Sequence, residues 1–288
     1  MSEWYYPKGS TAGGGWESAI SPTAAGWEHT GLRTAQLTPG QSLSLPPGPM
    51  ERVVVPLSGT FEVLPDGHGG IGLQGRESVW AGPTDVAYVG PNRGLTLKGN
   101  GRVAVCEAAA TEDREPAYLP VQAVPVELRG AGSCSREVRN FATPGVLDAE
   151  SMIACEVLTP AGNWSSYPPH KHDEELAGVE TALEEIYYFE LRSVIPGQGT
   201  PMGYQRVSAS PGREIDVLAE VHDQDAVLVP FGWHGPSMAA PGYDMYYLNV
   251  MAGPGRERAW RITDHPDQAW VRRMWAGQEP DPRLPFSA

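Results

Sequence analysis

The most informative part of the sequence is the stretch YPPHKHDEELAGVETALEEIYYF, at residues 167–189. It places His170 and His172 two residues apart, and side chains two apart on an extended strand leave the same face. Two such imidazoles form a chelating pair. A carboxylate, Glu185, opens a run of β-branched and aromatic residues, and a third imidazole, His234, follows in VPFGWHGP. Three histidines and a glutamate predict a mixed nitrogen and oxygen metal site.

These segments resemble the two motifs of the cupin superfamily, a small β-barrel. A Pro-Pro pair precedes the histidine pair, and His234 closes a D-x4-P-x-G-x-H pattern that begins at Asp225. In cupins the first motif supplies two histidines and a glutamate, and the second supplies one histidine. The resemblance therefore implies four metal ligands: His170, His172, Glu185 and His234.

The choice of the carboxylate ligand needs a further argument, because more residues separate His172 from Glu185 than separate the second histidine from the glutamate in the usual cupin motif. Four other glutamates compete for the role: Glu174, Glu175, Glu180 and Glu184. We favour Glu185 because a ligand needs a rigid strand, and the IYYF run that follows Glu185 reads as one. Glu184 should point to the opposite face by strand alternation.

Length and composition predict an all-β protein of two domains. The chain has 288 residues, more than one domain usually holds. It contains 34 Gly and 28 Pro, between which lie short β-branched and aromatic runs. This composition is typical of many short strands joined by tight turns.

The two halves of the chain look like copies of one unit. Asp85, Val86 and Pro91 repeat the order of Asp225, Val227 and Pro230. In this alignment Leu95 takes the place of His234, and the N-terminal half has no His-x-His. We therefore expect two cupin-type barrels in tandem, of which only the second binds metal: a metal-free barrel at residues 1–128, a metal-binding barrel at 129–262, and an irregular tail at 263–288.

Charge and cysteine content exclude some classes of function. A formal net charge of −14 and a pI near 4.9 argue against nucleic acid as a partner, since phosphate binding depends on Lys and Arg. Three cysteines at wide spacing do not form a disulfide framework and fit a reducing compartment. The first residues do not read as a signal peptide, and no apolar run is long enough to span a membrane. We expect a cytoplasmic protein without a membrane partner.

A closer resemblance emerges when HKHDEE, LEEIYY, GYQRV and GYDMYYLNVMAGP are taken together. Across residues 21–263 the chain is similar to the 5-deoxy-glucuronate isomerases of myo-inositol catabolism, with YYLNVMAGP as the most specific element. The resemblance implies an aldose–ketose isomerase that converts 5-deoxy-D-glucuronate to 5-dehydro-2-deoxy-D-gluconate, with a divalent metal as Lewis acid. It favours Zn as that metal, while the ligand types alone also suit Mn, Fe, Co or Ni. A homo-oligomer is compatible with the sequence.

Three other functions compete with this one. The 4-deoxy-5-hexosulose-uronate ketol-isomerases are related isomerases, and cupin dioxygenases use the same ligand set with Fe or Cu. Storage or sugar-sensing bicupins keep the barrels without chemistry. The retention of four ligands argues against the last class.

Residues that contact the substrate can be predicted from its chemistry and from strand alternation. A uronate needs a cation for its carboxylate, and arginine offers paired hydrogen bonds, so we predict Arg206 in GYQRV as the partner. Tyr187 shares the strand face of Glu185, and Tyr247 and Asn249 share one face of a later strand. We expect all four side chains at the site, while Lys171 should point away from it.

Overall fold

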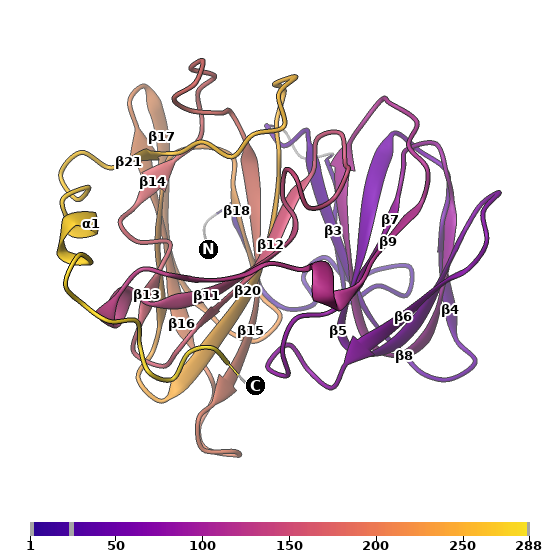
Figure 1. The fold of residues 1–288 in the computed structure, drawn as a ribbon, viewed down its shortest axis with the longest axis horizontal. Helices are drawn as coiled ribbons and strands as arrows, with labels where there is room; N and C mark the ends of the chain where they lie inside the picture. The colour runs from indigo at the N-terminus through magenta and orange to yellow at the C-terminus, as the bar shows by residue number, and fades with distance from the viewer. Residues whose placement is uncertain (1–2, 23–25, 287–288) are drawn as a thin grey trace.

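The structure is a computed structural model that describes residues 3–22 and 26–286. It consists almost entirely of antiparallel strands, arranged as two barrels side by side (Figure 1). Among the described residues the helices are limited to α1 (Val271–Met274) and two short 3-10 segments, η1 (Val121–Ala123) and η2 (Gly132–Cys134). The predicted all-β class with two barrels is confirmed.

The N-terminal barrel is one sheet with the strand order β2-β3-β8-β5-β7-β9, in which β4 also pairs with β8 and β6 with β5. Its strands are β2 (Ser18–Ile20), β3 (Thr30–Leu37), β4 (Ser42–Leu45), β5 (Met50–Pro65), β6 (Ile71–Arg76), β7 (Val86–Val89), β8 (Leu95–Ala109) and β9 (Ala117–Leu119). An apolar cluster fills it, and Leu95 belongs to that cluster at the position that aligns with His234.

The C-terminal barrel is built from two sheets. The first has the order β1 (Tyr5–Tyr6), β18 (Ala226–Val229), β15 (Glu184–Ser193), β20 (Tyr243–Ala252), β12 (Ile153–Thr159), β11 (Arg136–Ala142) and β10 (Val126–Arg129). The second has the order β17 (Arg213–Val221), β16 (Gly203–Ser210), β19 (Trp233–Ala239), β14 (His170–Lys171) and β21 (Thr263–Asp264), and β13 (Trp164–Ser165) pairs with β19.

The burial of each strand follows from its place in the molecule. In β17 buried and exposed residues alternate, because one face meets the barrel interior and the other meets solvent. In β15 both faces are buried: Tyr187 and Phe189 face the core of their own barrel, whereas Ile186 and Tyr188 join a cluster shared with the N-terminal barrel. The apolar run of β15 thus reflects a strand between two cores.

Buried polar contacts also join the two barrels. Arg76 of β6 forms an ion pair with Glu156 of β12. The carboxylate of Glu51 accepts backbone N–H groups from Ser151 and Met152 at 2.8 and 2.6 Å. These charged groups are satisfied across the interface, as buried charges require.

The chain ends cross the predicted domain limits. Strand β1, from the N-terminal arm, pairs with β18 of the C-terminal barrel. The predicted boundary at residue 128 falls within β10, which pairs with β11. In the predicted tail, β21 pairs with β14 and α1 lies at the outer edge of the C-terminal barrel (Figure 1). None of the described helices has the length and apolar character needed to cross a membrane.

Candidate active site

Three histidines meet in the C-terminal barrel, at the pairing of β14 with β19. His170 lies directly opposite His234 in this pairing, and His172 follows two residues after His170. The ring of His234 lies 4.5 Å from each of the other two rings, centroid to centroid. One ring nitrogen of each histidine lies within 4.8 Å of the others. The sequence prediction that these imidazoles converge is met by this geometry.

Backbone carbonyls orient all three rings. The Nδ1 atoms of His170, His172 and His234 lie 3.3, 3.0 and 3.1 Å from the carbonyl oxygens of Pro168, Leu183 and Gly232. A ring whose Nδ1–H donates to a carbonyl presents Nε2 as an acceptor, which is the form that binds a metal.

Glu185 completes the cluster from β15. Its Oε2 lies 3.1 Å from His172 Nε2 and 3.2 Å from His234 Nε2. The second contact is close but poorly aligned, so the buried Nε2 of His234 has no hydrogen-bond partner among the described residues. Burial alone would raise the pKa of Glu185, but the two imidazoles outweigh it and lower the pKa to about 2. A carboxylate with an unsatisfied buried nitrogen beside it fits a divalent metal ion.

The four competing glutamates have other partners. Glu174 and Glu180, together with Asp173, surround the Nζ atom of Lys171 at 2.5 to 2.8 Å. Glu175 accepts the backbone N–H of Ala182 at 3.2 Å. Lys171 points away from the histidines, as predicted.

Glu184 points to the opposite side of β15 from Glu185. Its carboxylate accepts three consecutive backbone N–H groups of the N-terminal arm, from Glu28, His29 and Thr30. Glu184 therefore joins the two halves of the chain. Its position outside the metal cluster is the one that strand alternation predicts.

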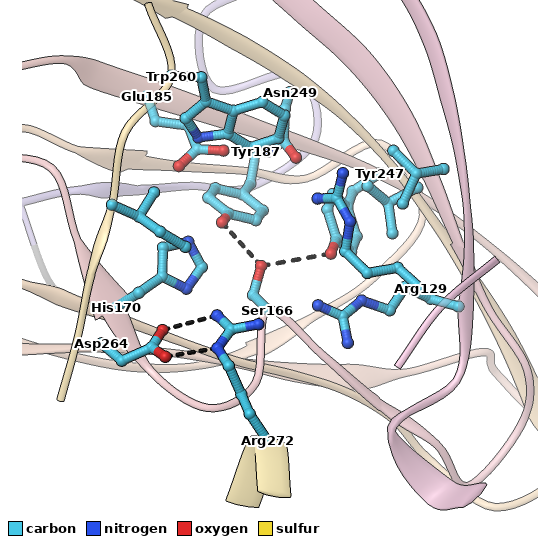
Figure 2. Close-up of a pocket in the computed structure, with 14 residues that line it drawn as sticks. Arg129, Ser166, His170, Glu185, Tyr187, Tyr247, Asn249, Trp260, Asp264 and Arg272 are labelled. Atoms are coloured by element: carbon cyan, nitrogen blue, oxygen red, sulfur yellow. Dashed lines mark hydrogen bonds and ion pairs between the residues drawn. The ribbon is translucent and has the colours of Figure 1, made fainter. Parts of the chain in front are cut away.

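A cavity of about 440 Å³ opens beside this cluster (Figure 2). Its wall contains His170 and Glu185 together with Tyr187, Tyr247 and Asn249, which the sequence analysis placed at the site. The remaining lining residues are Arg129, Arg136, Val138, Val157, Ser166, Trp260, Ile262, Asp264 and Arg272.

Arg206 does not reach this cavity. Its guanidinium forms an ion pair with Asp216 and donates to the carbonyl of Val217 at 2.9 Å. Its neighbours Gln205 and Val207 are buried, so Arg206 lies on the outer face of β16. The structure thus does not place the predicted carboxylate partner near the metal cluster.

Ser166 is a cavity residue that the sequence analysis missed. Its hydroxyl lies 3.0 Å from the hydroxyl of Tyr187 and 3.3 Å from that of Tyr247, between the two rings (Figure 2). Ser166 has a φ of 47°, which is uncommon for a residue other than glycine. A Cβ on Gly235 would lie 1.8 Å from the Ser166 carbonyl, so the glycine after His234 permits this close approach.

The two tyrosines stay protonated at neutral pH. Burial raises the pKa of Tyr187 well above its usual value, and Glu185 raises it further. Burial raises the pKa of Tyr247 to about 12. Both hydroxyls, with Ser166, are therefore donors of hydrogen bonds rather than bases.

Three arginines, also missed, line the cavity. They come from distant segments: Arg129 ends β10, Arg136 begins β11, and Arg272 lies in α1. Arg129 pairs with Glu127 at 2.8 Å, and Arg272 makes a paired contact with Asp264 (Figure 2). No local motif marks these arginines, because only the folded barrel brings the connector and the tail together.

The chain is similar to known proteins over most of its length. The model of the KduI/IolB family matches residues 4–271. A 5-deoxy-glucuronate isomerase of Geobacillus kaustophilus is 39% identical over 256 residues, which cover 88% of this chain and 89% of that protein. The corresponding enzyme of Bacillus subtilis strain 168 is 39% identical over 199 residues, covering 68% and 70%.

Solved structures show the same fold. An IolB-like protein of Salmonella typhimurium LT2 superimposes with a TM-score of 0.83 at 34% identity, covering 93% of this chain and 99% of that one. A Bacillus subtilis oxalate decarboxylase mutant superimposes with a TM-score of 0.61 at 11% identity, covering 92% and 80%. The predicted cupin fold is thereby confirmed.

Proposed function

Because the chain belongs to the KduI/IolB family, we propose that it converts 5-deoxy-D-glucuronate to 5-dehydro-2-deoxy-D-gluconate in myo-inositol catabolism. The observation that carries this proposal is that one cavity is lined both by two residues of the metal-ligand cluster, His170 and Glu185, and by three arginines. Such a cavity suits a small sugar acid, whose carbonyl and carboxylate lie at opposite ends of the molecule.

The metal part of the site consists of His170, His172, His234 and Glu185, which would hold one divalent ion, with zinc as our choice. The bound metal supplies a Lewis acid for the C1 carbonyl and the C2 hydroxyl of the sugar, which makes the C2 proton acidic. The ionised carboxylate of Glu185 and the three imidazoles suit this role.

The protein's own polar groups would hold the reacting end of the sugar. The hydroxyls of Ser166, Tyr187 and Tyr247 form one chain of hydrogen bonds on the cavity wall and keep their protons at neutral pH. They can donate to the sugar oxygens as charge shifts between C1 and C2. Asn249 donates to the carbonyl of Ile186 at 3.4 Å, which leaves its own carbonyl oxygen for a sugar hydroxyl.

The wider setting follows from the reaction. We place the enzyme in the cytoplasm, acting on a small-molecule uronate, and a homo-oligomer is compatible with it. Relatives that share this family over most of the chain carry the isomerase name, which favours this substrate over 4-deoxy-5-hexosulose-uronate and over oxygen chemistry.

The test is an assay of purified, metal-analysed protein on 5-deoxy-D-glucuronate, with the ketose product followed by NMR. We expect turnover of this substrate, slower turnover of 4-deoxy-5-hexosulose-uronate, and no oxygen uptake at an oxygen electrode. Preferred turnover of the second uronate, or oxygen uptake coupled to product formation, would refute the proposal.

A further inference from the structure

The buried arginines of this chain differ in one respect that points to a ligand. Within residues 3–22 and 26–286, four arginines are buried: Arg52, Arg76, Arg136 and Arg139. Arg52 pairs with Glu107, Arg76 with Glu156, and Arg139 with Glu137. Arg136 forms no ion pair with a carboxylate in the part of the chain that the structure describes, although it lines the cavity.

The contacts of Arg136 hold it in place without neutralising it. Its Nη1 donates to the carbonyl of Cys134 at 3.0 Å, and its guanidinium lies 5.5 Å from the ring centroid of Trp275. A Cβ on Gly130 would lie 2.7 Å from Nη1, so the turn between β10 and β11 closes tightly on the guanidinium. Removing an arginine from water without a counter-charge costs several kcal/mol.

The surroundings of Arg136 add positive charge. Burial, together with the nearby Arg129 and Arg272, lowers its pKa to about 10, so it remains charged at neutral pH. Arg129 and Arg272 each already hold a carboxylate, Glu127 and Asp264. In the same cavity, the buried indole N–H of Trp260 has no hydrogen-bond partner among the described residues.

We propose that Arg136 binds the carboxylate of the sugar acid and makes the site specific for uronates over neutral sugars. This inference rests on the proposed function for the nature of the substrate. The guanidinium can form paired hydrogen bonds with a carboxylate, and the bound anion supplies the counter-charge that the protein lacks. Arg129 and Arg272 would add positive potential, and the Trp260 N–H would donate to a sugar oxygen.

The test measures binding and so does not depend on turnover. Calorimetric titration of the metal-loaded full chain with D-glucuronate and with D-glucose gives the preference for the carboxylate. We expect wild-type protein to prefer D-glucuronate on the order of 100-fold, and Arg136→Gln to reduce this preference to a few-fold. Arg206→Gln, on the outer face of β16, is the matched control and should keep the wild-type preference.

Stability separates a binding role from a structural one. Because Arg136 has no counter-charge, Arg136→Gln should not lower the thermal midpoint of the ligand-free protein, whereas Arg139→Gln, which breaks a buried pair, should lower it. If Arg136→Gln does not fold, Arg136→Lys carries the titration, and a reduced preference for D-glucuronate is again expected.

An unchanged preference in a folded Arg136 variant, or wild-type protein that does not prefer D-glucuronate, would overturn the proposal. Selective binding of D-glucuronate that depends on Arg136, without isomerisation of 5-deoxy-D-glucuronate, would refute the proposed reaction and leave the carboxylate site standing. Isomerisation that is unaffected by Arg136→Gln would refute the carboxylate site and leave the proposed reaction standing.

Discussion

At the scale of single residues, the site consists of side chains that are held by hydrogen bonds but that keep a nitrogen or a charge available for a ligand. The Nδ1 atom of each histidine in the cluster lies at hydrogen-bond distance from a backbone carbonyl, and Glu185 contacts two of the three Nε2 atoms. Arg136 is fixed by a carbonyl and a ring but has no counter-charge. Buried groups left in this state are the ones expected to bind a metal or a ligand.

Removal of any one histidine should release the metal. We expect His170→Ala, His172→Ala and His234→Ala each to lose bound metal and activity, because one of four ligands disappears. Elemental analysis of dialysed protein gives the metal content. His68→Ala is the control, since His68 is exposed in the N-terminal barrel. Full metal content in one of the three variants would exclude that histidine as a ligand.

The carboxylate ligand can be tested separately. Glu185→Gln should lower metal occupancy, since it removes the charged oxygen that lies 3.1 Å from His172. Glu174→Gln and Glu175→Gln should retain the metal, because these carboxylates bond to Lys171 and to the backbone of Ala182. Elemental analysis of the three variants decides the matter, and the reverse pattern would mean that the loop carboxylates reach the metal.

At the scale of elements, the site depends on how closely the segment before β14 lies against β19. The two strands meet at His170 and His234, and the next residue along β19 is Gly235, with a φ of 96°. The backbone of Ser166 lies against this glycine, so the chain that carries the cavity hydroxyl contacts the chain that carries the third histidine. One glycine therefore couples the metal cluster to the cavity wall.

This coupling predicts a difference between two glycines with similar backbone angles. Gly242 has a φ of 90°, and no atom lies within 4 Å of the position that a Cβ would take there, so Gly242→Ala should cost only the backbone strain of about 1–2 kcal/mol. Gly235→Ala adds a clash at 1.8 Å with the Ser166 carbonyl. It should cost more stability in urea unfolding and also lower kcat, because the cavity hydroxyl moves. Equal losses in the two variants would contradict a role for Gly235 in positioning Ser166.

At the scale of the whole molecule, the two barrels share a core, and the carboxyl group of Glu190 lies at their interface. Glu190 of β15 lies 3.7 Å from Arg102 of β8, which also contacts Glu17 at 3.1 Å. Burial raises the pKa of Glu190 from 4.5 to about 7, despite the opposing effect of Arg102 and with Asp223 adding to it. The interface therefore favours the neutral form of this carboxyl group.

The interface should accordingly weaken as the pH rises. A carboxyl group with a raised pKa stabilises the folded state fully below pH 4.5, and this contribution is lost as the pH rises through about 7. The shift corresponds to at most about 3 kcal/mol of unfolding free energy. We expect Glu190→Gln to gain stability relative to wild type between pH 5 and 8. Urea unfolding at several pH values measures the difference, and a constant difference would contradict the raised pKa.

Strand alternation in the sequence was enough to predict part of the site, whereas the fold was predicted from composition, from the repeated unit and from the resemblance to cupins. The His-x-His spacing placed two imidazoles on one face, and the alternation of Glu184 and Glu185 separated a backbone acceptor from the residue that meets the histidines. The same reasoning brought Tyr187 and Tyr247 to the cavity. It works because neighbouring residues on a strand are forced to opposite faces, whatever the rest of the chain does.

Strand alternation alone does not say which face of a strand points into the barrel. The prediction that Arg206 contacts the substrate depended on the assumption that its face of β16 points inward. Val207, an apolar neighbour that needs burial, was the signal that turns Arg206 outward, and the structure places Arg206 against Asp216.

The positively charged part of the cavity lining was decided only by tertiary structure. Arg129, Arg136 and Arg272 come from a connector, a strand start and the tail, and they meet because β10, β11 and α1 are brought to one side of the barrel. No local pattern encodes such a meeting, since it results from the packing of segments that are distant in the sequence.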